Sequence, residues 1–389
     1  MKKLNKFSLI LVGIYIVTTL ISFVVFSGII KSLGDVQSPV PEAVTDGSKT
    51  LFDDSLPKTE PCPLTGQLFS KQQRQWWEEH RPLGVMIENH EDSRPQSGLT
   101  SADVVYEAVA EGGITRFLAV FYCQDAEIIG PVRSARTYFL DFISEYGDYP
   151  LYAHVGGANT SGPADALGQI RDYGWQNYND MNQFSIGFPV FYRDYDRLGR
   201  TVATEHTMYS STTRLWDYAK EERGLSNVDE DGNGWDEEFT YYEFKEDVAE
   251  GVRPAAQSIS YNFWDGYGDY LVDWSYDKAT NSYVRSNGGE PHIDLNTEKA
   301  VSAKNVVLLL MRESRANDGY EGNLHMLYGT KGTGDAIVFQ DGKEIEATWS
   351  KKSRTARLTL TDSRGQEIKY NPGLTWYSVL SPDTNIDTK

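Results

Sequence analysis

A run of 24 uncharged, mostly apolar residues near the amino terminus, Phe7–Ile30, constrains this chain more than any other feature. As a helix rising 1.5 Å per residue it would be roughly 36 Å long, enough to cross the hydrocarbon core of a bilayer. Lys2, Lys3 and Lys6 precede the run, so the amino terminus is expected in the cytoplasm and the bulk of the chain outside. A cleaved signal peptide is the alternative, but the run is longer than a signal core and no A-x-A site follows it. The sequence therefore predicts a cytoplasmic tail over 1–6 and an uncleaved single-pass anchor in the cell membrane over 7–31.

Beyond this anchor the chain is strongly acidic. The net charge is −19 over 389 residues, and the residues after position 31 hold 33 basic against 56 acidic side chains, a net −23. Such a field repels nucleic acid and anionic lipid headgroups, which excludes nucleic acid as a partner and leaves the anchor as the membrane contact. Only two cysteines occur, Cys62 and Cys123, too few for a disulfide framework or a four-cysteine zinc site. Whether they are bonded stays open, and an anchored outer domain of this composition suggests a Gram-positive envelope.

Hydrophobic periodicity divides the rest of the chain. Residues 32–61, with four prolines and no apolar period, are typical of a linker. Strand patterns at 82–87, 117–122 and 151–155 alternate with helical patterns at 134–146, after 161 and at 212–223, which predicts an α/β or α+β domain over 62–225. Residues 226–253 form an acidic connector. From 254 to 384 we find only strand signals, including hairpins at 273–285 and at Asp341-Gly342, and predict a mostly antiparallel β domain.

Several motifs cluster in the first predicted domain. MIENH, RPQSGL, ADVVYE, EGGITRF and GPVRSAR lie within 81–136, YAHVGG follows at 152–157, and YNPGLTW at 370–376. This set resembles the YerB-like family of bacterial envelope proteins, whose two halves are known as domain of unknown function 3048, over most of 60–384. The resemblance implies the division of the fold and an envelope location but no established chemistry. Many members are lipoproteins, whereas Cys62 lies far beyond the apolar run, so we expect the transmembrane helix to replace the lipid.

An arginine-rich segment is the strongest candidate site. Gly130-Pro131 ends a strand, and a helix is expected to begin at Ser134, with Arg133 and Arg136 on one face of it. A helix amino terminus and guanidinium groups both bind phosphate oxygens. The alternative is a structural network in which the arginines pair with nearby carboxylates. The predicted ligand-binding set comprises Asn89, His90, Arg94, Arg116, Arg133, Ser134, Arg136 and His154.

Two enzymatic alternatives place the acids of the same region in catalysis. The order of elements is similar to that of the LytR-CpsA-Psr phosphotransferases, which join teichoic-acid-like polymers to peptidoglycan, and this implies a metal or base role for Asp103. Glu107 and Glu111 could instead be the acid and base of a peptidoglycan-cleaving enzyme, or lie four apart on a helix face. A non-catalytic envelope adaptor, with an exposed aromatic or apolar patch and an envelope protein as partner, is the third class. We favour binding of an anionic cell-wall precursor or polymer and leave open whether the protein is an enzyme.

Metal ligands are sparse in the sequence. Asp229, Asp231 and Asn233 match the first half of a calcium-binding loop, whereas the twelfth position is Thr240 instead of Glu, and a solvated acidic loop is the favoured alternative. Ca²⁺, or Mg²⁺, is the cofactor considered. His90, His154 and His206 lack the H-x-x-H or H-E-x-x-H spacing of zinc proteins, so no zinc site is expected.

Overall fold

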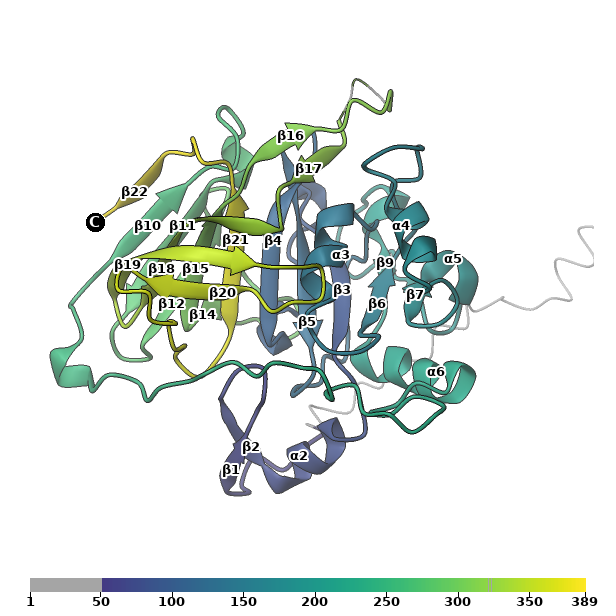
Figure 1. Cartoon of the computed structure of the whole chain (residues 1–389), viewed down its shortest axis with the longest axis horizontal. Coiled ribbons are helices and arrows are strands. Elements are labelled where there is room, and N and C mark those ends of the chain that lie inside the picture. Colours follow the sequence, from purple (N-terminus) through teal and green to yellow (C-terminus); the bar gives the residue numbers. More distant parts are fainter. Residues whose placement is uncertain (1–50, 321, 323) are drawn as a thin grey trace, which may run out of the picture. The chain divides into compact units, whose positions relative to one another are not determined.

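A ten-stranded mixed sheet runs through the computed structural model, which describes residues 51–389 except 321 and 323 (Figure 1). The predicted tail, the anchor over 7–31 and most of the linker lie outside the described residues. Among the described residues no helix has the length and apolar character that a membrane crossing needs. Residues 52–389 form one compact unit. The sheet has the order β20 (Thr359–Asp362), β19 (Lys343–Lys351), β18 (Gly332–Gln340), β15 (Asn305–Leu310), β21 (Thr375–Leu380), β4 (Val104–Glu111), β5 (Ile114–Phe121), β3 (Leu83–Glu88), β6 (Leu151–His154) and β7 (Asp180–Asn182).

Smaller elements surround this sheet. A second, antiparallel sheet consists of β13 (Glu290–Pro291), β12 (Ser282–Asn287), β11 (Val272–Asp277), β10 (Ser258–Tyr261) and β22 (Ile386–Thr388), with β14 (Ser302–Ala303) beside β12. Three two-stranded pairs are β1 (Lys58–Pro61) with β2 (Leu68–Ser70), β8 (Tyr192–Arg193) with β9 (Met208–Tyr209), and β16 (Glu313–Arg315) with β17 (Met326–Tyr328). The α-helices are α2 (Lys71–Trp77), α3 (Thr137–Ile143), α4 (Ala166–Asp172), α5 (Gln183–Ile186) and α6 (Thr212–Arg223). Short 3₁₀ turns are η1 (Glu91–Ser93), η2 (Leu99–Ser101), η3 (Thr204–His206), η4 (Glu250–Val252) and η5 (Gly268–Tyr270).

The two faces of the large sheet are covered by different layers. On one face the ring of Tyr106 stacks on Phe142 of α3, with 4.6 Å between ring centroids. On the other face Trp376 of β21 packs against Trp274 of β11, with 5.5 Å between centroids. Side chains alternate between faces along each strand, so one strand contributes to both layers. The described chain is therefore a helix layer, a mixed sheet and an antiparallel sheet packed in that order.

Most predicted elements are present. The mixed α/β region and the antiparallel β region both occur, and α6 ends at Gly224, whose φ of +64° is the left-handed conformation that stops a helix. Asp341 and Gly342 connect β18 to β19 with φ values of +55° and +67°, as a type I′ hairpin requires. Residues 104–106, whose short apolar pattern is compatible with either a strand or a helix, begin β4.

Two predicted helix starts are wrong by three residues or more. Helix α3 begins at Thr137 instead of Ser134, because Arg136 is extended, with φ −136° and ψ 148°. Helix α4 begins at Ala166, because the carboxylate of Asp165 accepts the backbone N–H of Gly168 at 2.8 Å and caps the helix there. Arg133 and Arg136 consequently both precede α3 and do not share a helix face.

Strand β21 connects the two parts of the sequence. It lies between β15 and β4 and pairs in parallel with both, so that Trp376 is opposite Val306 on one side and Val105 on the other. The large sheet thus takes strands from both 62–225 and 254–384. The parallel pairing also departs from the antiparallel pattern predicted for the carboxyl-terminal segment.

Candidate functional site

The sequence-predicted acids of β4 project to opposite faces of the large sheet. Glu107 accepts a hydrogen bond from the hydroxyl of Thr115 at 2.9 Å on the face toward the antiparallel sheet. A register irregularity between Val109 and Glu111 moves the Glu111 side chain to the helix-covered face, where it pairs with Arg116. A glycosidase needs two carboxylates facing one substrate bond, and Glu107 and Glu111 do not meet this requirement.

Three of the predicted arginines come together on the helix-covered face. We call Arg116, Arg133 and Arg136, with their partners Glu88 and Glu111, the arginine cluster. Arg116 donates to Glu111 at 2.8 Å, and Arg136 pairs with the other oxygen of the same carboxylate. Arg133 lies 3.1 Å from Glu88. Each arginine therefore has a carboxylate partner, as in the ion-pair alternative.

Burial distinguishes the members of the arginine cluster. The side chains of Arg116 and Arg136 are 2% and 7% exposed, whereas that of Arg133 is 23% exposed. Arg116 also donates to the backbone carbonyl of Ser134 at 2.9 Å, so Ser134 contributes through its main chain. Burial lowers the pKa of all three guanidinium groups. Arg116 and Arg136 are thus internal residues that fix the segment before α3.

Arg94 and Asn89 belong to a separate network on the opposite face. The Asn89 side-chain oxygen accepts from Arg94 at 3.1 Å, from Gln96 at 3.0 Å and from Asn287 of β12 at 2.7 Å. Beside it, Arg285 of β12 donates to Glu107 at 2.8 Å, and both of these side chains are completely buried. No sequence signal indicated Arg285 as a partner of Glu107, because 178 residues separate the two. This network joins the two sheets, and its members other than Arg94 are buried.

The two predicted histidines differ in burial. His154 is buried at the end of β6, with its Nε2 2.6 Å from Asp180 and its Nδ1 2.6 Å from the carbonyl of Gly156. His90 lies at the end of β3 and stacks on His206, with 4.9 Å between the ring centroids. His206 hydrogen-bonds Glu88 at 2.9 Å and thereby contacts the arginine cluster, although the two histidines are far apart in the sequence.

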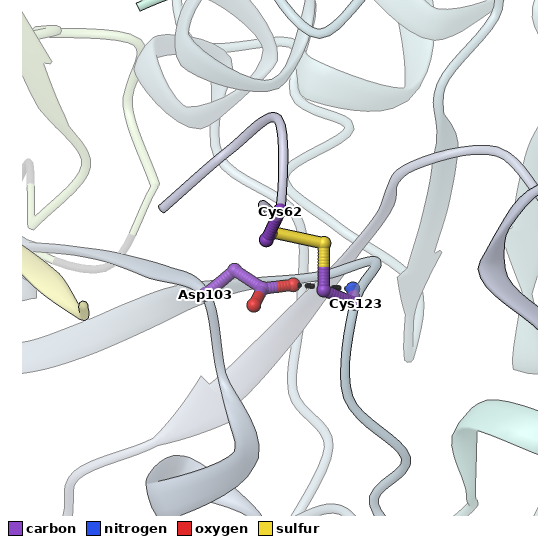
Figure 2. A group of neighbouring side chains, drawn as sticks. All are labelled: Cys62, Asp103 and Cys123. Atoms are coloured by element: carbon purple, nitrogen blue, oxygen red, sulfur yellow. Dashed lines mark hydrogen bonds between the residues drawn. A yellow bond between two sulfur atoms is a disulfide. The ribbon is translucent and has the colours of Figure 1, made fainter. Parts of the chain in front are cut away.

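Asp103 lies at the other end of β4, beside a disulfide between Cys62 and Cys123 (Figure 2). Its carboxylate accepts the backbone N–H groups of Tyr122 and Cys123 at 2.6 and 2.8 Å, and burial raises its pKa to about 7. Eight residues of strand separate it from Glu111, roughly 26 Å at 3.3 Å per residue. Asp103 therefore does not converge with the arginines, as the phosphotransferase alternative would require. Cys62 and Cys123, whose pairing the sequence left open, are therefore bonded to each other.

In the predicted calcium loop, the Asp229 carboxylate accepts hydrogen bonds from other residues of the same loop. The Asp229 carboxylate accepts backbone N–H groups from Asp231 at 3.0 Å and from Asn233 at 2.9 Å, and the amide of Asn233 donates to it as well. These contacts lower the pKa of Asp229. Calcium binding at this loop stays a prediction.

A cavity of about 370 Å³ opens beside the first turns of α3, next to the arginine cluster. Thr137, Tyr138 and Asp141 line it from α3, Gln169 and Tyr173 from α4 and the residue after it, and Arg312 and Lys331 from the segments flanking β16 and β17. Lys331 donates to Asp141 at 2.6 Å. Arg312 is exposed and has no ion-pair partner among residues 51–389 outside the two undescribed positions. The sequence did not indicate Arg312, because no motif surrounds it.

The fold defines a two-part protein whose halves share one sheet, and two family models match those halves. The "Protein of unknown function (DUF3048) N-terminal domain" matches residues 64–226, and the corresponding C-terminal domain matches residues 259–377. The chain therefore belongs to the DUF3048 family, which confirms the resemblance seen in its motifs.

One sequence relative and one solved structure each match most of this chain. "Putative lipoprotein YerB" of Bacillus subtilis (strain 168) is 32% identical over 327 residues, which are 83% of this chain and 86% of the relative. The crystal structure of YerB protein from Bacillus subtilis superposes with a TM-score of 0.67 at 27% identity, covering 85% of this chain and 100% of that one. The mixed sheet with its antiparallel companion is thus a fold shared with a solved relative.

Proposed function

We propose that this chain is a membrane-attached protein of the outer cell envelope that binds an anionic ligand in the cavity beside α3. The name of the Bacillus subtilis relative describes a lipoprotein, which supports attachment to a membrane with the domain outside. The apolar run over 7–31 supplies the attachment in this chain. Ligands of the stated charge in that compartment are phosphate-bearing cell-wall precursors and polymers.

The observation that carries the proposal is an unpaired cation in a ligand-sized cavity. At about 370 Å³ the cavity is in the size range of small-molecule sites. Arg312 and Lys331 bring two positive charges to its wall, and Asp141 is paired with Lys331. In a chain that is strongly acidic outside the membrane, a cavity with this balance favours an anion over a cation.

The proposed ligand contact is therefore in the cavity beside α3 and not in the arginine cluster. Arg116 and Arg136 already use their terminal amino groups on Glu111 and on backbone carbonyls, and both are buried. Thr137, which lines the cavity, directly follows Arg136 in the chain. We therefore assign Arg116 and Arg136 the role of fixing the start of α3, which sets one wall of the cavity.

Titration of the full-length protein with inorganic diphosphate tests this function. A charge-assisted hydrogen bond from Arg312 contributes about 1.5–3 kcal/mol, so Arg312→Ala is expected to weaken diphosphate binding about tenfold or more without lowering the melting temperature. Arg312→Lys should recover part of the affinity, because a point charge cannot reproduce the planar fork. Isothermal titration calorimetry measures the dissociation constant of diphosphate for the native protein and for each variant.

Arg315→Ala is the matched control, since Arg315 is an exposed arginine three residues away that does not line the cavity. It should bind diphosphate as the native chain does. Equal losses in the two variants would indicate only a general surface-charge effect, and the proposal would fail. It would fail equally if the native protein bound no diphosphate.

A further inference from the structure

A second cluster outside the proposed cavity contains two histidines and an aspartate. One nitrogen from each of His90 and His206, and one carboxylate oxygen of Asp92, all lie within 4.8 Å of one another. His90 and Asp92 come from the end of β3 and from η1, whereas His206 ends η3, 116 residues further along the chain. The fold therefore brings together a set of donor atoms that no spacing motif in the sequence predicts.

The donor types suit a transition-metal ion. Two imidazole nitrogens and one carboxylate oxygen are a common ligand set for Zn²⁺, which leaves a fourth position open for water or a substrate. Ligands about 2.0–2.1 Å from a tetrahedral zinc ion lie about 3.4 Å apart, so the three donors need to move inward by an ångström or so. Ca²⁺ and Mg²⁺ prefer all-oxygen sites and are poorly matched to this set.

Glu88 orients the ring of His206 for metal binding. Nδ1 of His206 lies 2.9 Å from a carboxylate oxygen of Glu88, and both side chains are buried. An N–H donated from Nδ1 to Glu88 leaves the lone pair on Nε2, which is the carboxylate–histidine arrangement found behind metal-binding imidazoles. The second oxygen of Glu88 pairs with Arg133, which holds the carboxylate in place.

The other two donors are accessible. The His90 side chain is 28% exposed and that of Asp92 55% exposed. Nδ1 of His90 accepts the backbone N–H of Asp92 at 3.1 Å, and since a neutral ring has one lone pair, metal binding through either nitrogen gives up this bond. One oxygen of Asp92 pairs with Arg200 at 3.3 Å, and the other lies 3.9 Å from His90.

From this geometry we propose that His90, Asp92 and His206 bind one Zn²⁺ ion, with Glu88 as the residue that orients His206. The proposal is independent of the anion-binding function, because none of the three donors lines the cavity beside α3. His90 and Asp92 follow the carboxyl end of β3, which pairs in parallel with β6, and ligand sites are common at the carboxyl ends of parallel strands.

Titration of the full-length, metal-free protein with ZnCl₂ tests the site. One saturable Zn²⁺ per chain and a rise in melting temperature are expected, with no such rise from MgCl₂. His90→Gln, His206→Gln and Asp92→Asn should each weaken zinc binding at least tenfold. Glu88→Gln should weaken it by 10–100-fold while leaving all three ligands in the chain.

His80→Gln is the matched control. His80 stacks on Trp216, with 4.6 Å between the ring centroids, and belongs to no group of metal ligands among the described residues. Its removal should leave the zinc affinity unchanged. Asp92→Asn alters an exposed side chain, so it remains interpretable even if His206→Gln unfolds. The absence of saturable binding, or binding that survives loss of Asp92 and His90, would overturn the assignment.

Discussion

At the scale of single residues, Asp103 is a buried carboxyl group with a strongly raised pKa. Its carboxyl is completely buried beside the disulfide, and burial outweighs the two backbone N–H donors, so the pKa rises from 3.8 to about 7 (Figure 2). The folded protein therefore holds a proton on Asp103 at pH values where the unfolded chain has lost it. This proton makes the stability of the fold depend on pH.

The native protein is expected to lose stability as the pH rises from about 4 to about 7. We predict that Asp103→Asn abolishes this loss. A raised acid pKa stabilises the fold below 3.8 relative to the pH range above 7, and the difference approaches about 4 kcal/mol. Asn can still accept the N–H groups of Tyr122 and Cys123. Urea unfolding of both proteins at pH 4.5 and 7.5 gives the two differences. A native protein whose pH dependence equals that of the variant would contradict the raised pKa.

At the scale of elements, the segment β1–β2–α2 depends on one covalent link and a few aromatic contacts. The disulfide joins Cys62, just after β1, to Cys123 at the end of β5. Trp77 of α2 packs near Phe69 and Tyr122, with 5.7 and 6.4 Å between ring centroids. Because this segment contributes no strand to the large sheet, the link fixes its position at the sheet's end.

Loss of the disulfide is predicted to destabilise the protein by about 4 kcal/mol. The bond closes a loop of 61 residues, and the entropy that this removes from the unfolded chain grows with the logarithm of loop length. The Cys62→Ala/Cys123→Ala double variant should show this loss in urea unfolding and should no longer respond to dithiothreitol. Native protein whose unfolding midpoint is unmoved by dithiothreitol, under conditions where free thiols are detected, would argue against a stabilising role.

At the scale of the whole molecule, buried charge connects the two sheets. The guanidinium of Arg285 in β12 is ion-paired with Glu107 in β4 and lies 4.8 Å from the ring centroid of Trp376 in β21. Nδ1 of His292 accepts a hydrogen bond from Arg285 at 2.8 Å. Burial, together with the charge of Arg285, lowers the pKa of His292 well below its usual value. The layers are therefore joined by polar contacts as well as by apolar packing.

We predict that Arg285→Met destabilises the fold by about 3–5 kcal/mol, because Glu107 is left as an unpaired buried charge. Adding Glu107→Gln should restore much of this loss, since the amide still accepts from Thr115 and needs no counter-charge. Urea unfolding of the two single variants and the double variant measures the coupling. Additive losses would mean that the pair is not coupled.

The sequence alone determined the local elements and the family. Short apolar runs marked strands such as β3 and β5. The Asp341-Gly342 and Gly224 signals placed a hairpin and a helix end, because turn chemistry acts over neighbouring residues. The motifs between 81 and 136 identified the DUF3048 family, which the family models confirm. The membrane anchor over 7–31 stays a prediction from the sequence, because it lies outside the described residues.

Only the tertiary structure decided which distant residues meet. Alternation indicates that residues share a face of one strand, but it does not indicate which strand lies beside it, and the entropy of loop closure grows too slowly to exclude distant partners. Hence the sequence could not place β21 between β15 and β4, or join Glu88 to His206 across 118 residues. One irregularity in β4 sent Glu111 to the arginines and left Glu107 to Arg285, because a bulge reverses the face of every side chain that follows it.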